Sequence, residues 1–284
     1  MSSQLVYLNG EYLPLDEAKV SVLDRGFIFG DGVYEVIPAY GSKALRFKHH
    51  MQRLQNSLDA VRITNPLSNE KWQEIINKLI AATDSLDQSV YLHITRGVAS
   101  RDHQFPDGTK PTVFVMSSAL YPVDSKLLDK GIAAITLDDI RWQYCNIKAI
   151  ALLPNILLRQ QAVDKDAKEA ILIRDGFMTE GAASNVFIVK DGTIKTPPKN
   201  NQLLPGITRD LVVELAKNHK MPIQETAISE EEFLAADEIW LTSSTKEILP
   251  VTLINNQQVG KGKPGPVWQN MFSKYQDYKE SLRV

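Results

Sequence analysis

The chain has 284 residues, of which 43% are hydrophobic and 23% charged, and its formal net charge is −2. This composition is typical of a globular protein with one large domain or two smaller ones. Lysine and arginine are scattered along the chain, which excludes the basic surface of a nucleic-acid-binding protein. The sequence has no run of about 18 apolar residues and no signal-peptide pattern at its start. We therefore expect a cytoplasmic protein with neither nucleic acid nor a membrane as partner.

The first third of the chain predicts a sheet covered by two helices. The Asn9-Gly10 pair between two apolar runs predicts a β-hairpin, because both residues tolerate positive φ. Apolar residues recur at helical spacing in residues 49–61 and 72–82, which predicts the two helices. The strands are expected at residues 5–8, 12–13, 33–39, 43–47, 90–95 and 112–116.

A domain boundary is expected near the middle of the chain. Residues 118–126, which include Pro122 and Ser125, have the composition of a linker. The sequence therefore predicts an N-terminal domain, an interdomain linker and a C-terminal domain. Their expected boundaries are residues 1–118, 119–126 and 127–284.

The second half predicts further strands and helices in irregular alternation. Strands are expected at residues 132–137, 169–173, 185–189 and 238–241, with Glu180 in a loop between the second and third of them. Helices are expected near residues 155–164, after Gly206, after a capping box at Ser229, and over 266–281. The whole is interpreted as an α+β fold (mixed α/β) with mostly antiparallel strands.

Lys148 and Glu180 are the first candidates for chemistry. Lys148 has apolar neighbours, and burial lowers the pKa of a lysine from about 10.4, which favours the neutral amine that condenses with aldehydes. Lys148 alone is better interpreted as a structural lysine at a strand end, with its apolar stem buried and its charge in water. A carboxylate such as Glu180 keeps a pyridine nitrogen protonated and so makes pyridoxal phosphate an electron sink. The two residues together indicate a pyridoxal phosphate enzyme.

Several other residues suit a phosphate group. A helix that begins at Ile207 and Thr208 offers free backbone N–H groups and a hydroxyl. Further hydroxyls or a cation would come from Ser243, Ser244 and Arg53. Each also has a structural interpretation: a helix cap, a polar turn and an exposed helix arginine. The single cysteine, Cys145, can form neither an internal disulfide nor a thiolate metal site, and we expect it to be buried; no metal site is expected.

Motifs in one order along residues 20–250 resemble those of a known family. They are Asp24-Arg25-Gly26-Phe27, Phe29-Gly30-Asp31-Gly32-Val33-Tyr34-Glu35, Arg53-Leu54, Ile147-Lys148, Thr179-Glu180-Gly181, Ser184-Asn185-Val186-Phe187, Leu204-Pro205-Gly206-Ile207-Thr208-Arg209 and Thr242-Ser243-Ser244-Thr245. The chain resembles the class IV (fold-type IV) pyridoxal phosphate aminotransferases. The resemblance implies a smaller N-terminal α/β domain and a larger C-terminal pseudo-barrel domain that binds the cofactor.

The resemblance also implies roles for individual residues. Lys148 corresponds to the Schiff-base and proton-transfer lysine, Glu180 to the partner of the pyridine nitrogen, and Leu204 to the residue that packs on the ring. The residues that correspond to phosphate contacts are Arg53, Ile207, Thr208 and Ser244, with Ser243 beside them.

The segment with Arg101 and His103 indicates a subfamily. It resembles the Arg-x-His loop that binds the substrate α-carboxylate in D-amino acid aminotransferases, with Tyr34 as a third partner. A guanidinium forms two parallel hydrogen bonds to a carboxylate, and imidazole and phenol add donors from other directions. The resemblance implies transamination of D-alanine- or D-glutamate-type substrates with 2-oxoglutarate or pyruvate as acceptor, ping-pong through pyridoxamine phosphate. It also implies a homodimer whose sites are shared between subunits.

Three alternatives remain from the sequence. They are a branched-chain L-amino acid aminotransferase, an aminodeoxychorismate lyase and a cofactor-binding protein without activity. The chain also departs from the familiar pattern in ways that bear on cofactor hydrogen bonding and affinity. The departures are Asn146 for an Asp, Ala182 and Ala183 for serines, Ser244 for a Thr, and Lys246 after the hydroxyl cluster.

Overall fold

The computed structural model describes residues 4–283, and their contacts divide into two units. Unit 1 takes the described part of Met1–Tyr121 together with Ile147–Ala151 and the end of the chain from Leu282. Unit 2 takes Pro122–Asn146 and Leu152–Ser281. The change of unit after Tyr121 lies within the linker expected at 119–126. The segment that contains Lys148, however, packs with unit 1. The boundaries expected from the sequence place it in the C-terminal domain, residues 127–284.

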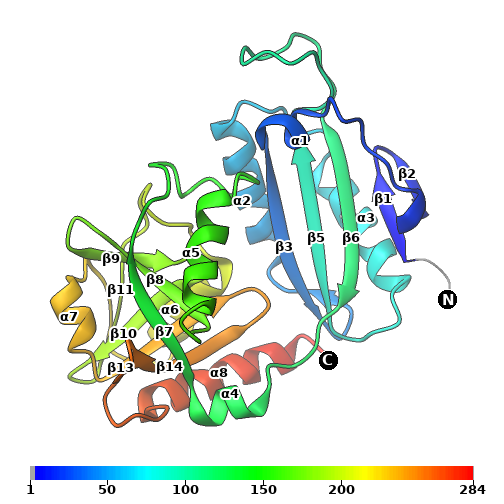
Figure 1. Ribbon diagram of the computed structural model, residues 1–284. Coiled ribbons are helices and arrows are strands. Elements are labelled where there is room, and N and C mark those ends of the chain that lie inside the picture. Colours follow the sequence, from blue (N-terminus) through cyan, green and yellow to red (C-terminus); the bar gives the residue numbers. More distant parts are fainter. Residues whose placement is uncertain (1–3, 284) are drawn as a thin grey trace. The chain divides into compact units, whose positions relative to one another are not determined.

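Unit 1 is an antiparallel sheet with two long helices on one face (Figure 1). The strands lie in the order β2-β1-β6-β5-β3-β4. The expected hairpin is confirmed, with positive φ at Asn9 and Gly10. The elements are β1 (Leu5–Leu8), β2 (Glu11–Pro14), the short 3₁₀ helix η1 (Leu15–Glu17), α1 (Arg25–Phe29), β3 (Gly32–Tyr40), β4 (Lys43–Ala44), α2 (Phe47–Ala60), α3 (Asn69–Ala81), β5 (Gln88–Thr95) and β6 (Thr112–Ala119).

The two helices close the core of unit 1 because each has an apolar stripe. α3 begins after Ser68, whose hydroxyl accepts a hydrogen bond from the backbone N–H of Lys71, and it buries Trp72 completely. The strand expected at residues 43–47 was wrong beyond Ala44. Arg46 adopts a left-handed backbone conformation with φ of 49°, which turns the chain out of the strand and into α2.

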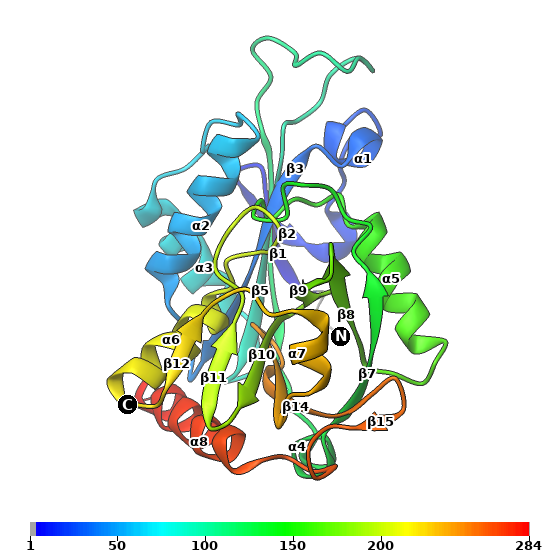
Figure 2. The same ribbon diagram turned by 90° about the vertical axis from the view of Figure 1, so that its left-hand side faces the viewer.

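Unit 2 is built on a larger, curled sheet with α6 and α8 packed on it (Figure 2). Its main path is β12-β11-β10-β13-β14-β7-β8-β9, with β15 paired to β14. Most neighbours are antiparallel, but β7 runs parallel to both β8 and β14, and β11 runs parallel to β12. The elements are α4 (Ser125–Lys130), β7 (Ile132–Asp138), α5 (Leu153–Val163), β8 (Glu169–Arg174), β9 (Phe177–Gly181), β10 (Asn185–Lys190), β11 (Thr193–Thr196), α6 (Ile207–Asn218), β12 (Ile223–Glu225), α7 (Glu230–Leu234), β13 (Glu238–Ser243), β14 (Glu247–Ile254), β15 (Gln257–Gln258) and α8 (Pro266–Ser281).

Two expectations for unit 2 need correction. Glu180 lies in strand β9 and not in a loop, because residues 177–181 pair with β8. The expected linker also ends early, since α4 begins at Ser125 with its N-terminal N–H groups capped by Asp124. Within residues 4–283, no helix combines the length and the apolar character that a bilayer span requires.

Candidate active site

Lys148 lies on a short extended segment that runs beside the start of β3 in unit 1. The backbone N–H of Tyr34 donates to the carbonyl of Lys148 at 3.0 Å, and that of Ile150 donates to Gly32 at 3.1 Å. Gly32 is packed so tightly that an added Cβ would lie 2.4 Å from the carbonyl oxygen of Ile94 on β5. The sheet therefore fixes the backbone that carries Lys148.

The side chain of Lys148 contacts the ring of Tyr34. Its Nζ lies 4.0 Å from the ring centroid, within the range of a cation–π interaction. The backbone N–H of Lys148 donates to the hydroxyl of Ser57 on α2 at 3.2 Å. Two of the sequence-predicted site residues, Tyr34 and Lys148, are thus adjacent although 114 positions separate them in the sequence (148 − 34).

Arg53 belongs to a buried charged cluster. Its Nε and Nη2 donate to the two carboxylate oxygens of Glu35 at 2.8 and 2.7 Å, and Nδ1 of His50 lies 2.8 Å from the same carboxylate. All three side chains are buried, so the interpretation of Arg53 as an exposed helix arginine was wrong. Glu35 and His50 were not predicted to have this role, since only the fold brings them to Arg53.

The cluster has a clear charge balance. Burial raises the pKa of Glu35, but the attraction of Arg53 and His50 and their hydrogen bonds outweigh it and hold the pKa well below its usual range. Burial lowers the pKa of His50, against the pull of Glu35. Glu35 is therefore the anion that holds Arg53 in place.

Replacing Glu35 by glutamine is expected to destabilise the protein by about 3–5 kcal/mol, because it leaves Arg53 buried without its counter-charge. The pH dependence should also change. A carboxyl whose pKa is lowered by folding stabilises above its unfolded pKa, and that contribution is lost as the pH falls through the folded pKa. The variant should therefore lose less stability than the parent below about pH 4. Urea unfolding at several pH values measures both effects.

The matched control is Glu74→Gln, which breaks the exposed ion pair between Glu74 and Lys71. It should change the free energy of unfolding little, since water screens such pairs. Equal losses in the two variants would contradict the assigned role of Glu35.

The loop that carries Arg101 and His103 is anchored by an arginine. Nη1 of Arg25 donates to the backbone carbonyls of Asp102 at 2.6 Å and Gln104 at 3.3 Å, while its Nε is paired with Asp31. The anchoring residue itself is buried. A buried side chain therefore fixes the backbone of an exposed loop.

The side chains of Arg101 and His103 are brought together over one ring. The guanidinium carbon of Arg101 lies 5.5 Å from the ring centroid of Phe29, and the His103 ring lies 5.4 Å from it. Both are exposed, and within residues 4–283 neither makes a hydrogen bond or an ion pair. Their donor groups are available to an outside carboxylate.

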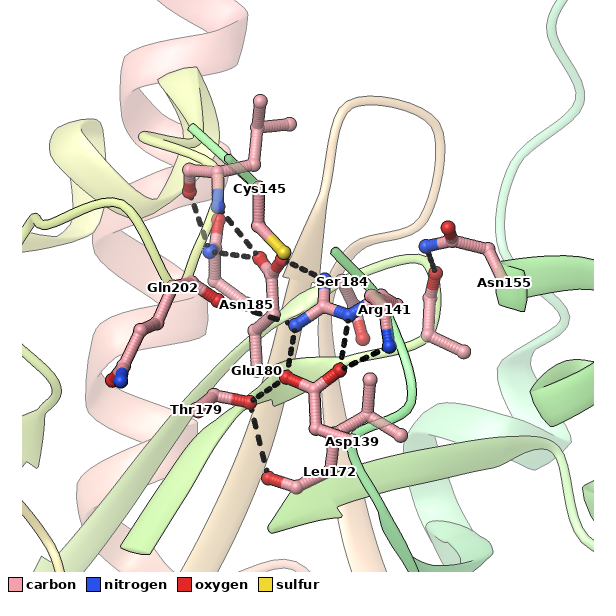
Figure 3. Close-up of polar contacts among 12 residues, drawn as sticks. Asp139, Arg141, Cys145, Asn155, Leu172, Thr179, Glu180, Ser184, Asn185 and Gln202 are labelled. Carbon is pink, nitrogen blue, oxygen red and sulfur yellow. Dashed lines mark hydrogen bonds and ion pairs between the residues drawn. The ribbon is translucent and has the colours of Figure 1, made fainter. Parts of the chain in front are cut away.

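Glu180 of unit 2 is buried and held by donors on several sides (Figure 3). Nδ2 of Asn185 and the backbone N–H of Leu204 each donate to its Oε2 at 3.1 Å, and Nη1 of Arg141 donates to Oε1. Arg141 is in turn fixed by Asp139, with hydrogen bonds of 2.8 Å from Nε and Nη2. The network orients the carboxylate of Glu180.

The pKa of Glu180 reflects a balance between burial and these donors. Burial raises it to about 7, although Arg141 and the Leu204 N–H act in the opposite direction. Arg141 was not among the residues predicted for the site. No local signal in the sequence links it to Glu180, which is 39 positions away.

The N-terminus of α6 lies beside the Glu180 network. An added Cβ at Gly206, which precedes the helix, would lie 1.9 Å from Oδ1 of Asn185. No side chain caps this helix, and Thr208 in its first turn is buried. Asn185 is opposite Thr242 across the β10–β13 pair, and the Oγ1 of Thr242 is buried without a hydrogen-bond partner. Uncapped N–H groups and hydroxyls therefore meet at one place.

These residues fit pyridoxal phosphate. A helix N-terminus with nearby hydroxyls binds a phosphate group, and a buried carboxylate binds the protonated ring nitrogen. Unit 2 supplies both the carboxylate of Glu180 and the start of α6. Leu204, whose backbone N–H donates to Glu180, lies just before Gly206 at the start of that helix. Ser243 and Ser244 are partly exposed where β13 ends, next to Thr242. Cys145 is buried, as expected, and burial raises the pKa of its thiol.

Comparison with known proteins agrees with this geometry. The family model described as amino-transferase class IV matches residues 32–254. The chain belongs to the class IV aminotransferases and is an enzyme of that kind, which confirms the resemblance and the fold class expected from the sequence. Enzymes of this class depend on pyridoxal phosphate.

Two kinds of relative are similar over nearly the full length. The chain is 38% identical to D-alanine aminotransferase from Staphylococcus haemolyticus, over 97% of this chain and 98% of that protein. It is 38% identical to D-alanine aminotransferase from Bacillus licheniformis, over 96% of each. Among solved structures, branched-chain amino acid aminotransferase from Escherichia coli has a TM-score of 0.88 at 28% identity, covering 96% of this chain and 93% of that one. The branched-chain aminotransferase from the thermophilic archaeon Thermoproteus uzoniensis, solved with norvaline, has a TM-score of 0.88 at 26% identity, covering 99% and 96%.

Proposed function

We propose that the chain transfers the amino group of a D-amino acid, such as D-alanine or D-glutamate, to a 2-oxo acid such as 2-oxoglutarate or pyruvate. The observation that carries the preference for the D enantiomer is the exposed pair Arg101 and His103 on its anchored loop. The pair offers the forked donors that hold an α-carboxylate, and Tyr34 is the proposed third partner. The curated relatives named D-alanine aminotransferase support the same proposal.

The side chains divide the chemistry between them. Bound pyridoxal phosphate supplies the electron sink and carries the amino group between the two half-reactions of a ping-pong cycle. Nζ of Lys148 would hold the cofactor until the substrate amino group takes its place. The freed amine would then accept the proton from the substrate Cα and donate it to the cofactor carbon that receives the amino group. Glu180 keeps the ring nitrogen protonated, and Leu204 packs on the ring. The phosphate is held by the uncapped start of α6 and by hydroxyls and a guanidinium; the residues are Ile207, Thr208, Ser243, Ser244 and Arg53.

We also propose a homodimer in which the Arg101 loop completes the site of the other subunit. The loop is tied to the segment before α1, since Ala99 donates its N–H to the carbonyl of Leu23 at 3.3 Å. That segment exposes Val22 and Leu23, and α1 exposes Phe27; a partner would cover these three side chains. Light scattering after gel filtration measures the mass of the particle, which should be that of two chains and not of one chain of 31.9 kDa. A cytoplasmic location remains a prediction from the sequence.

Replacing Arg101 by alanine is expected to raise the KM for D-alanine by roughly 10- to 100-fold, because a charged hydrogen-bond pair to the carboxylate is lost. Lys110→Ala is the matched control, since it removes one exposed positive charge from the same loop. Steady-state kinetics with D-alanine and 2-oxoglutarate measure the change. An unchanged KM in the Arg101 variant, or an equal rise in both, would rule out the assigned role.

A branched-chain L-amino acid aminotransferase is the second candidate. It is favoured by the fold, since the two solved neighbours described above, each with a TM-score of 0.88, carry the branched-chain name. Turnover of D-alanine and L-leucine by the same preparation separates the two functions. Activity with L-leucine alone would replace the first proposal by the second.

A further inference from the structure

Lys246 is the last residue of the turn between β13 and β14, directly after the hydroxyl cluster. Ser243 and Glu247 pair across the turn, and the backbone N–H of Lys246 donates to the Ser243 hydroxyl at 3.3 Å. Glu247 has a positive φ of 57°, and its carboxylate is held by Gln276 at 2.7 Å and Lys279 at 2.9 Å on α8. These contacts anchor the turn to α8 and so fix the backbone that carries Lys246.

The surroundings of Lys246 are positively charged. Glu169, Arg159 and Lys168 are the charged groups that act on its ammonium group. The carboxylate of Glu169 accepts hydrogen bonds from the Ser184 hydroxyl and from the Ala170 N–H, both at 3.0 Å. Nη1 of Arg159 is buried without a hydrogen-bond partner. Among the described residues, Glu169 is thus the one carboxylate that acts on Lys246 against two further cations, and this leaves the place attractive to a further anion.

The ammonium group of Lys246 is also available. Although the residue is exposed, the protein around it partly buries the ammonium and so lowers its pKa; Glu169 opposes this shift, and Arg159 and Lys168 add to it. Within residues 4–283, Lys246 forms no side-chain hydrogen bond and no ion pair. A bound carboxylate would offset the repulsion of Lys246 by Arg159 and Lys168, and it would replace the water that burial removes from the ammonium group.

The chemistry of the cofactor indicates which anion this is. In pyridoxal phosphate, the carbon that receives the amino group is across the ring from the nitrogen and next to the arm that carries the phosphate. Glu180 marks the nitrogen end of the site, and the start of α6 with the hydroxyl cluster marks the phosphate end. A substrate joined to that carbon would therefore lie toward the phosphate end, where Lys246 follows the hydroxyl cluster. Its α-carboxylate is assigned to Arg101 and His103, which leaves a side-chain carboxylate for Lys246.

We propose that Lys246 binds the distal carboxylate of acidic substrates, so that the enzyme prefers D-glutamate-type amino acids and dicarboxylic 2-oxo acids to D-alanine and pyruvate. The proposal rests on the function proposed above and specifies its substrate class. Ser184, which holds Glu169, ties this place to the same β9–β10 connection that follows Glu180.

The test compares Lys246→Met, which removes the charge, with Lys246→Arg, which keeps it. In the methionine variant, kcat/KM for D-glutamate should fall roughly tenfold relative to that for D-alanine, and the arginine variant should recover most of the ratio. Lys261→Met is the control, because it removes an exposed charge from unit 2 beyond β15. The dissociation constant of glutarate for the holoenzyme, by calorimetry, should rise in the methionine variant while that of butyrate does not.

Three results would overturn the proposal. One is an unchanged ratio in the methionine variant, and another is an equal loss for both substrates. The third is a fall in affinity for pyridoxal phosphate with an unchanged ratio, which would assign Lys246 to the cofactor phosphate. Failure of the proposed function gives a different result, since the parent enzyme would then turn over no D-amino acid. Glutarate binding that depends on Lys246 would in that case still support the carboxylate site.

Discussion

Replacing Lys148 by alanine should lower kcat for D-alanine transamination by about 10²- to 10⁴-fold, the usual contribution of a positioned proton-transfer group. The variant also loses the amine that holds the cofactor, so the yellow colour of the purified protein should disappear. The backbone around the residue is fixed by β3, through the hydrogen bond between Tyr34 N–H and the Lys148 carbonyl. The fold should therefore survive the substitution. Stopped-flow absorbance and steady-state assays measure the two effects.

Lys48→Ala is the matched control for this prediction, because Lys48 is an exposed lysine on α2 of the same unit. It should retain parental activity and colour. Circular dichroism on both variants separates lost chemistry from lost structure. A folded Lys148→Ala protein that still converts D-alanine at the parental rate would refute the proposed mechanism.

Replacing Glu180 by glutamine should lower kcat by about 10²- to 10³-fold, the range seen when a preorganised electrostatic partner is removed. Burial raises the pKa of Glu180 to about 7, close to neutrality. A protonated ring nitrogen would bring a positive charge to the carboxylate, and the resulting charged hydrogen bond is strong. Glutamine keeps the shape but cannot hold the ring nitrogen in its protonated form. Kinetics and the absorbance spectrum of the bound cofactor report the change.

Stability must be measured beside activity in the Glu180 variant, since Arg141 loses one of its partners. The two bonds between Arg141 and Asp139 remain, so the protein should stay folded. Glu231→Gln, on the exposed face of α7, is the control for loss of a carboxylate in the same unit. Parental turnover by a folded Glu180→Gln protein would show that the ring nitrogen needs no carboxylate here.

Much of the local structure follows from periodicity and turn chemistry. The final helix was expected over 266–281, and α8 has those bounds. The hairpin at Asn9 and Gly10 could also be predicted, because few residue types other than these readily adopt a positive φ. Strand β14 was not anticipated, since Pro250 argues against an interior strand. It exists because β13 and β7 flank it, which no window of sequence reveals.

The site, like the fold, has a part that the sequence predicts and a part that only the structure reveals. Motifs and a likeness to a family indicated Lys148, Tyr34 and Glu180, and the structure places the first two in contact. The residues that hold the site were not predicted. Glu35, His50 and Arg141 act through partners that are distant in sequence, and a buried charge is recognised only once the surrounding core is known.

The strand-like piece around Lys148 has a consequence for how the polypeptide can be divided. Because Ile147–Ala151 joins unit 1, a fragment cut after Tyr121 would lack the backbone that borders the start of β3 and, with it, the reactive amine. A nascent chain on the ribosome likewise cannot add this segment to its first unit until residue 151 has emerged. If halves of related enzymes were recombined after Tyr121, Lys148 would come from the second parent. It would then pack against a β3 that comes from the first parent.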